Sequence, residues 1–212
     1  MLFRSKIMKK LLAVASALAL TVSAVSPAVL ADETLATQQT ETSARENMQK
    51  ILESVKQRVE IPSECSEFLS RTEEQYGEKV YNFTWNEKDG NKSVNITCTA
   101  DGVITNYSIH GFKSDDKDNT PNLPKISESD AKKTAENFLK QINPDFPYEI
   151  KIYGSNGSIF GNGYTFYIKT YVNGVLFTNG NGSVNIDGTD GYVMGFDLGY
   201  IQADFPSINN AI

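Results

Sequence analysis

Side chains that commonly catalyse hydrolysis are scarce in this sequence of 212 residues. His110 is its only histidine, and Cys65 and Cys98 are its only cysteines. A Ser-His-Asp or Cys-His arrangement would have to use His110, but there is no Gly-x-Ser-x-Gly elbow and neither cysteine has a recognisable nucleophile context. We therefore expect His110 to be an exposed residue at a strand end, and we predict no catalytic residue.

Acidic residues are abundant, with 26 Asp and Glu, but no spacing singles out the paired carboxylates that a glycosidase needs. Asp115, Asp116 and Asp118 carry the oxygen ligands that Ca²⁺ prefers. Because the cluster lacks the glycine and glutamate of an EF-hand loop, we interpret it as a solvated linker. Asp187 and Asp190 are better explained as hairpin-turn residues. We therefore predict no metal site and no cofactor.

The two cysteines allow two interpretations. Outside the cytoplasm Cys65 and Cys98 could form a disulfide, and closing a loop of that length would stabilise the fold by about 3–4 kcal/mol. The alternative is a pair of buried, reduced thiols. The spacing fits no metal motif, because there is no Cys-x-x-Cys and only one histidine.

The first 31 residues have the pattern of a cleavable export signal. Lys9 and Lys10 precede an apolar run from Leu11 to Val25, and Val29-Leu30-Ala31 suits a signal peptidase. The run is shorter than the roughly 20 residues that a spanning helix needs, so we expect no membrane span after cleavage. This pattern predicts a secreted or cell-surface protein.

The mature chain would be strongly acidic. Removing residues 1–31 removes four basic residues and no acidic ones, which leaves 16 basic against 26 acidic residues, a net charge of −10. An acidic surface repels phosphate backbones, so we expect no nucleic-acid partner.

Hydrophobic periodicity predicts a helix followed by antiparallel strands, twice over. In the first half, a helix at 43–59 precedes three strands that begin near Val80, Val94 and Val103, separated by Asp-Gly turns. In the second half, Ser127 with Asp130 resembles a helix-starting capping box. The strands predicted after this helix are 148–153, 163–171, 175–178, 182–187 and 191–199.

The two halves also share letters, which indicates a tandem duplication. Ser93-Val94-Asn95-Ile96 recurs as Ser183-Val184-Asn185-Ile186, and an Asp-Gly turn follows each copy. We divide the chain into a signal peptide at 1–31, a flexible tether at 32–42, a first repeat at 43–112, a linker at 113–125, a second repeat at 126–201 and a tail at 202–212 in which a further repeat could begin.

The helix Ile126–Leu139 resembles the helix of YcdB/YcdC-repeat proteins. The segments Tyr164–Tyr167, Val172–Val175 and Gly182–Ile186 are also similar to these repeats, and so is Tyr81–Trp85 in the first half. The resemblance covers residues 44–208. Modules of this family are related to PepSY domains and to propeptides of thermolysin-like proteases.

This resemblance implies an α+β fold of two tandem units, each a helix packed on a curled antiparallel sheet. Such repeats occur in exported Gram-positive proteins, often ahead of S-layer homology domains that bind cell-wall polymers. We therefore expect the chain to be the N-terminal part of a longer surface protein. The family has no catalytic residues to transfer.

These observations favour a non-enzymatic, secreted or cell-wall-associated module that binds a protein or a cell-wall polymer. Tyr167 and Tyr171 lie on the opposite face of their strand from Phe166, so we predict that they form an exposed interaction surface. One alternative is a PepSY-like regulator or inhibitor of a secreted protease. The other is a secreted hydrolase, which nothing in the sequence requires.

Overall fold

The computed structural model of the protein describes four stretches of the chain, residues 27–88, 90–112, 123–157 and 163–199. Most of the predicted signal peptide, the Asp115–Asp118 cluster and the predicted tail therefore lie outside the described residues. The chain divides into two units, Met1–Thr42 and Ser43–Ile212, and all the described strands belong to the second unit.

The first helix, α1, spans Pro27–Arg58 and is longer than the sequence predicted. Residues 32–42, which we expected to be a flexible tether, are helical. The physical reason is the lack of helix breakers, because this segment is rich in Thr, Gln and Glu but has neither Gly nor Pro to interrupt a helix. Within the described residues, neither helix combines the length and apolar character needed to cross a membrane.

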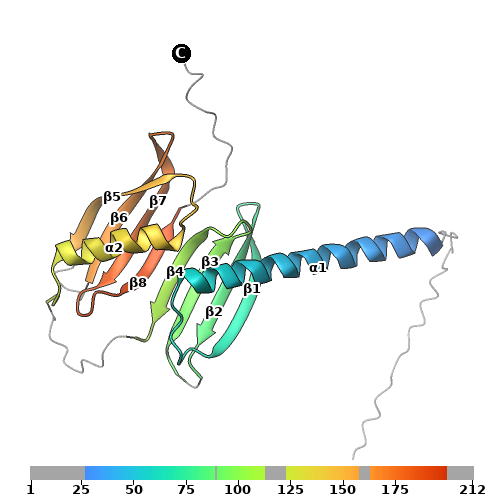
Figure 1. Ribbon diagram of the computed structural model, residues 1–212, viewed down its shortest axis with the longest axis horizontal. Helices are drawn as coiled ribbons and strands as arrows, with labels where there is room; N and C mark the ends of the chain where they lie inside the picture. The colour runs from blue at the N-terminus through green and yellow to red at the C-terminus, as the bar shows by residue number, and fades with distance from the viewer. Residues whose placement is uncertain (1–26, 89, 113–122, 158–162, 200–212) are drawn as a thin grey trace, which may run out of the picture. The chain divides into compact units, whose positions relative to one another are not determined.

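Eight strands form one antiparallel sheet in the order β1-β2-β3-β4-β8-β7-β6-β5 (Figure 1). Their bounds are β1 Glu67–Gln75, β2 Glu78–Asn86, β3 Ser93–Thr99, β4 Ile104–His110, β5 Glu149–Gly157, β6 Gly163–Val172, β7 Val175–Asp187 and β8 Val193–Leu198. The segments predicted at 175–178 and 182–187 are thus one continuous strand, β7.

The prediction of two tandem helix-on-sheet units is wrong. Over the described residues the protein is mostly β, with two helices and a single sheet. The sheet is single because the last strands of two meanders, β1–β4 and β5–β8, pair with each other. β4 and β8 are antiparallel neighbours in which Asn106 pairs with Asp197 and Tyr107 with Phe196. An unpaired strand edge exposes backbone donors and acceptors, and this pairing covers the two edges that separate units would have left open.

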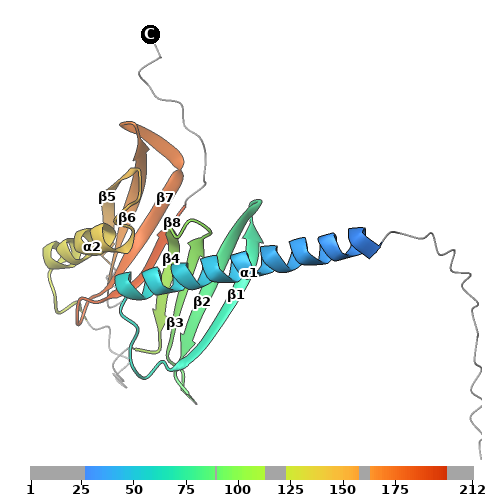
Figure 2. The same ribbon diagram turned by 45° about the vertical axis from the view of Figure 1, so that its right-hand side comes forward.

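Residues 43–58 of α1 and the second helix lie on the same face of the sheet (Figures 1 and 2). The second helix, α2, spans Glu128–Ile142 and packs against β5 to β8. Ser127 accepts a hydrogen bond from Asp130 N at its start, which confirms the predicted cap. Phe138 of α2 contacts the rings of both Tyr107 and Phe196, each at 5.7 Å between centroids, so the hydrophobic core continues across the β4–β8 junction.

The pairing register shows how the two meanders correspond. Phe83 pairs with Ile96, and Phe166 pairs with Val184. Tyr81 and Tyr164 then occupy matching positions, and each stacks on the phenylalanine two residues later at 6.3 Å between ring centroids. In this alignment the two Ser-Val-Asn-Ile segments lie two residues out of register. Because side chains alternate with a period of two, a shift of two residues keeps each of them on the same face of the sheet. The two segments therefore have the same sequence but do not occupy equivalent positions in their meanders.

Candidate binding face of the sheet

The face of the sheet that carries no helix is lined by small polar side chains. Alternation along the inner strands, as in β2 and β3, puts apolar residues under the helices and hydroxyls and amides on the opposite face. Threonine–asparagine pairs bond across neighbouring strands there. Thr97 Oγ1 donates to Asn82 Oδ1 at 2.7 Å, and Thr165 Oγ1 donates to Asn185 Oδ1 at 2.8 Å. This network fixes the rotamers of the face without burying it.

A group of tyrosines and lysines lies on this face over β5 and β6, and we call it the tyrosine–lysine strip. It consists of Tyr153, Tyr167, Lys169, Lys151 and Tyr171. Tyr153 and Tyr167 are 54% and 38% exposed, and the centroids of their rings lie 6.1 Å apart. Lys169 Nζ lies 4.1 Å from the Tyr153 ring centroid, and Lys151 Nζ lies 4.9 Å from that of Tyr171.

The structure thus brings the two predicted interaction residues to one face, with Lys169 between them along β6. Lys151 also forms a 2.9 Å ion pair with Glu149, which raises the pKa of the lysine through that hydrogen bond. Sequence reasoning missed the contribution of Tyr153, because a bulge between Ile152 and Gly154 changes the alternation of β5 at that position. A binding role for Tyr167 and Tyr171 stays a prediction.

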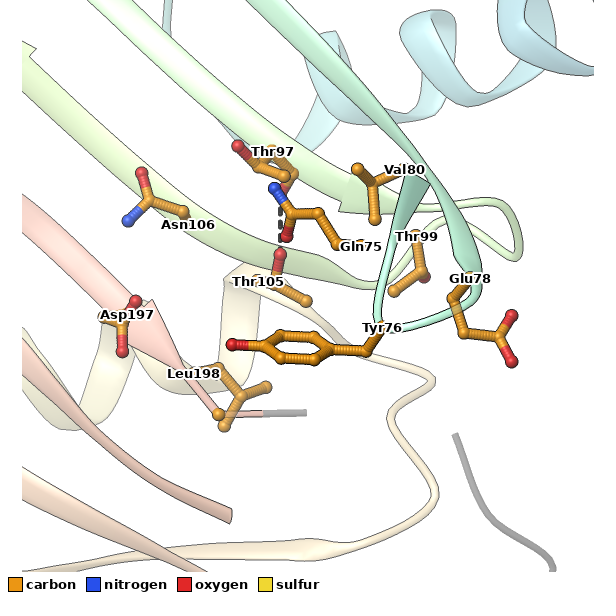
Figure 3. Close-up of a pocket in the computed structure, with 11 residues that line it drawn as sticks. Gln75, Tyr76, Glu78, Val80, Thr97, Thr99, Thr105, Asn106, Asp197 and Leu198 are labelled. Carbon is orange, nitrogen blue, oxygen red and sulfur yellow. Dashed lines mark hydrogen bonds between the residues drawn. The ribbon is translucent and has the colours of Figure 1, made fainter. Parts of the chain in front are cut away.

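A pocket of about 520 Å³ lies on the same face, where β1 and β2 meet the β4–β8 junction. The two-residue turn Tyr76-Gly77 forms one wall. Tyr76 has φ 54° and is 95% exposed. Figure 3 shows its ring extending from the turn toward Asp197 and Leu198, which form the opposite side of the pocket.

Polar groups from three strands form the floor of this pocket. Thr97 belongs to β3, Thr105 and Asn106 to β4, and Asp197 to β8. Thr105 Oγ1 donates to the Thr97 carbonyl at 3.3 Å (Figure 3). Asn106 and Asp197 are directly paired positions of the junction. The pocket therefore exists only because the two meanders share a sheet.

On the helix side, a polar network joins the ends of both helices. Arg58 donates from Nη1 to the Ile142 carbonyl at 3.0 Å and from Nη2 to the Gly102 carbonyl at 2.9 Å. Asn143 Oδ1 accepts from Ile104 N at 2.8 Å. Burial lowers the pKa of Arg58, although arginine stays charged at any physiological pH. These contacts position α1 and α2 on the sheet and offer no reactive group.

The structure holds Cys65 and Cys98 as buried, free thiols. No disulfide joins the two cysteines in this structure, and a bridge formed after export stays a prediction. Burial raises the pKa of Cys98 to about 12, so its thiol stays protonated.

The remaining candidates occupy structural positions. His110 is exposed at the end of β4. Asp187 accepts hydrogen bonds from Thr189 N at 2.7 Å and Asp190 N at 3.0 Å, so it organises the β7–β8 turn as its sequence suggested. In the part of the chain that the structure describes, no group of three or more His, Cys, Asp or Glu residues could hold a metal ion.

Comparisons with known proteins give two matches. The model of a family described as the YcdB, YcdC repeated domain matches residues 48–199. Among solved structures, the Bacillus megaterium YpeB C-terminal domain is similar at 17% identity and a TM-score of 0.49, over 79% of this chain and 68% of that one. No curated protein matches the chain.

Proposed function

We propose, from the premise that this chain belongs to the family of the YcdB, YcdC repeated domain, that it is a non-catalytic binding module of the cell envelope. The family match confirms the resemblance seen in the sequence. In this proposal the helix-free face of the sheet binds a protein or a cell-wall polymer, and the helix face holds the fold together.

The observation that carries the proposal is the tyrosine–lysine strip. Tyr153 and Tyr167 expose large parts of their rings on a face that contributes little to the core. Exposed aromatic groups with a polar rim are typical of interaction sites, and tyrosine is enriched in interfaces because its ring is rigid and has a polar tip.

The absence of a recognisable catalytic arrangement supports a binding role. Among the described residues, His110 lies at a strand end, and the thiol of Cys98 is buried under α1 with a raised pKa. A nucleophilic cysteine needs a solvent-accessible thiol with a lowered pKa, whereas the thiol of Cys98 is buried and its pKa is raised. The polar groups of the helix-free face mainly bond one another.

Export from the cytoplasm is part of the same proposal and is supported by the sequence of residues 1–31. A basic start, an apolar run and a small-residue cleavage site form a signal that the secretion machinery removes. The acidic mature chain would then function outside the membrane as a secreted or surface-held protein.

Co-sedimentation with cell walls tests this proposal. The purified protein is mixed with walls of the producing bacterium, either native or stripped of their proteins. We expect it to pellet with native walls and the double variant Tyr153→Ser/Tyr167→Ser to lose at least about tenfold in affinity. Binding to stripped walls indicates a polymer, and binding that disappears on stripping indicates a protein.

A matched control removes a tyrosine from the helix side. Tyr148→Ser changes the groove beside α2 and should pellet like the unmodified protein. Circular dichroism should show equal folding for all three proteins. The proposal is wrong if the unmodified protein stays in the supernatant with both wall preparations. It is also wrong if the double variant binds native walls as tightly as the unmodified protein.

A further inference from the structure

We propose that the pocket beside Tyr76 holds a neutral, hydroxyl-rich saccharide unit, so that the partner on the helix-free face is a glycan. This inference rests on the proposed binding function and names the class of its ligand. It uses the pocket between the β1–β2 turn and β8, which is separate from the tyrosine–lysine strip.

The conformation and exposure of Tyr76 are the first argument. Gln75 pairs with Glu78, so Tyr76 and Gly77 form a two-residue hairpin turn with φ values of 54° and 83°. Such turns favour Asn-Gly or Asp-Gly, and a bulky residue with positive φ is unusual. Because the residue is 95% exposed, Tyr76 gains almost no core packing in return. A tyrosine that folding does not require is consistent with a ring placed there to contact a ligand.

The floor of the pocket supplies the second argument. Asn106 and Asp197 are paired across β4 and β8, so an amide that donates and accepts lies beside a carboxylate that accepts. The hydroxyls of Thr97 and Thr105 already donate to Asn82 Oδ1 and to the Thr97 carbonyl, so they add acceptors to the floor. Neighbouring hydroxyls of a sugar ring need this mixture of donors and acceptors. The apolar C–H face of such a ring can pack on Tyr76.

The charge of the pocket selects among glycans. Its lining includes the carboxylates Glu78 and Asp197 and contains no Lys, Arg or His. Like charges repel at short range, so phosphate-bearing polymers and uronic-acid chains are disfavoured. A neutral or N-acetylated sugar meets no such penalty. The volume of about 520 Å³ falls in the usual range of small-molecule sites.

Nuclear magnetic resonance titration of the isotope-labelled protein tests the inference. The probes are N-acetylglucosamine oligomers, a neutral glucan oligomer, oligogalacturonate and inorganic phosphate. We expect at least one neutral oligomer to shift the amide signals of Tyr76, Asn106 and Asp197 in a saturable way. The two anionic probes should leave these signals unchanged.

Two variants separate the ring from the fold. Tyr76→Asn removes the ring but suits a positive φ, so the protein should keep its thermal stability and lose at least about tenfold in affinity for the oligomer. Tyr76→Phe keeps the ring and should bind within about twofold of the unmodified protein. Asp197→Asn should weaken the binding of the neutral oligomer, and phosphate should still not bind.

Each outcome decides the inference separately from the proposed function. If no neutral oligomer shifts these signals, or if Tyr76→Asn binds the oligomer as tightly as the unmodified protein, the proposal that this pocket binds a saccharide is wrong. The binding module still stands in that case, provided that the protein pellets with walls and Tyr153→Ser/Tyr167→Ser does not. A tighter response to oligogalacturonate than to neutral oligomers would also overturn the inference.

Discussion

Asn143 directly follows α2, and its carboxamide bonds β4 in the way that the peptide group of a neighbouring strand would. Its Oδ1 accepts from Ile104 N and its Nδ2 donates to the Ile104 carbonyl, both at 2.8 Å. β8 pairs with β4 only at residues 106–108, so the side chain satisfies backbone groups beyond the end of that ladder. Arg58 Nη1 adds a third bond to Oδ1 at 3.2 Å.

Replacing Asn143 with alanine should destabilise the protein by about 3 kcal/mol. The side chain is only 7% exposed, so the change leaves a buried donor and a buried acceptor without partners, and each such loss costs about 1–3 kcal/mol. Urea unfolding measures the change in the free energy of unfolding. Asn156→Ala, at an exposed position of β5, is the matched control and should be neutral. A loss below about 1 kcal/mol for Asn143→Ala would show that water replaces these bonds.

At the scale of elements, the Asp-Gly turns connect the last two strands of each meander. Gly102 and Gly191 have φ values of 88° and 75°, where residues with a Cβ atom are strained. The Gly102 carbonyl also accepts from Arg58 Nη2, so the β3–β4 turn joins the network that holds both helix ends. The conformation of this turn therefore affects more than its own hairpin.

Gly102→Ala should lower the free energy of unfolding by about 1–2 kcal/mol, because a left-handed conformation costs that much for a residue with a Cβ atom. The site has room for the methyl group, since a Cβ there meets only Ile51 at 3.9 Å. Gly154→Ala is the control, because its φ is not positive and no atom lies within 4 Å of the added group. Thermal unfolding compares them. Equal melting temperatures for the two variants would contradict the role assigned to φ.

The strands that the sequence predicted are those with one buried and one polar face. Tyr81, Phe83 and Trp85 alternate with polar residues in β2, and the structure buries all three. The sequence did not predict β1. All nine of its residues are exposed, and its apolar residues Phe68 and Leu69 are adjacent instead of alternating with polar ones, so no period of two appears. An edge strand of this kind is defined by its partner, which local sequence does not contain.

The sequence predicted part of the tyrosine–lysine strip but not the pocket beside Tyr76. Alternation along β6 predicts that Tyr167 and Tyr171 share a face, and they do. The saccharide pocket was not found because its parts come from β1, which was not recognised, and from the β4–β8 pair. The only local signal was Tyr76-Gly77 three residues before Val80, which as a tight turn predicts a strand on both sides.

At the scale of the whole molecule, the pairing of β4 with β8 makes one folding unit of two similar meanders. The alternation in these strands predicts which face each residue takes but not which strand lies beside it. Two further contacts cross the junction. Phe138 packs on both Tyr107 and Phe196, and Asn143 accepts a hydrogen bond from Ile104 N of β4. A perturbation in one meander should therefore reach the other.

Ile168→Ala should lower the stability of both halves equally. Ile168 is fully buried in β6, so its truncation costs about 2–5 kcal/mol. Trp85, the only tryptophan, is 4% exposed in β2 of the other meander, and its fluorescence reports that half alone. In a two-state protein every probe shows the same transition, so the Trp85 midpoint in urea should fall together with the midpoint measured by circular dichroism. A Trp85 midpoint that does not move would mean that the meanders unfold independently. The β4–β8 pairing would then contribute too little to couple them, and a pocket built across that junction would be lost when either half opened.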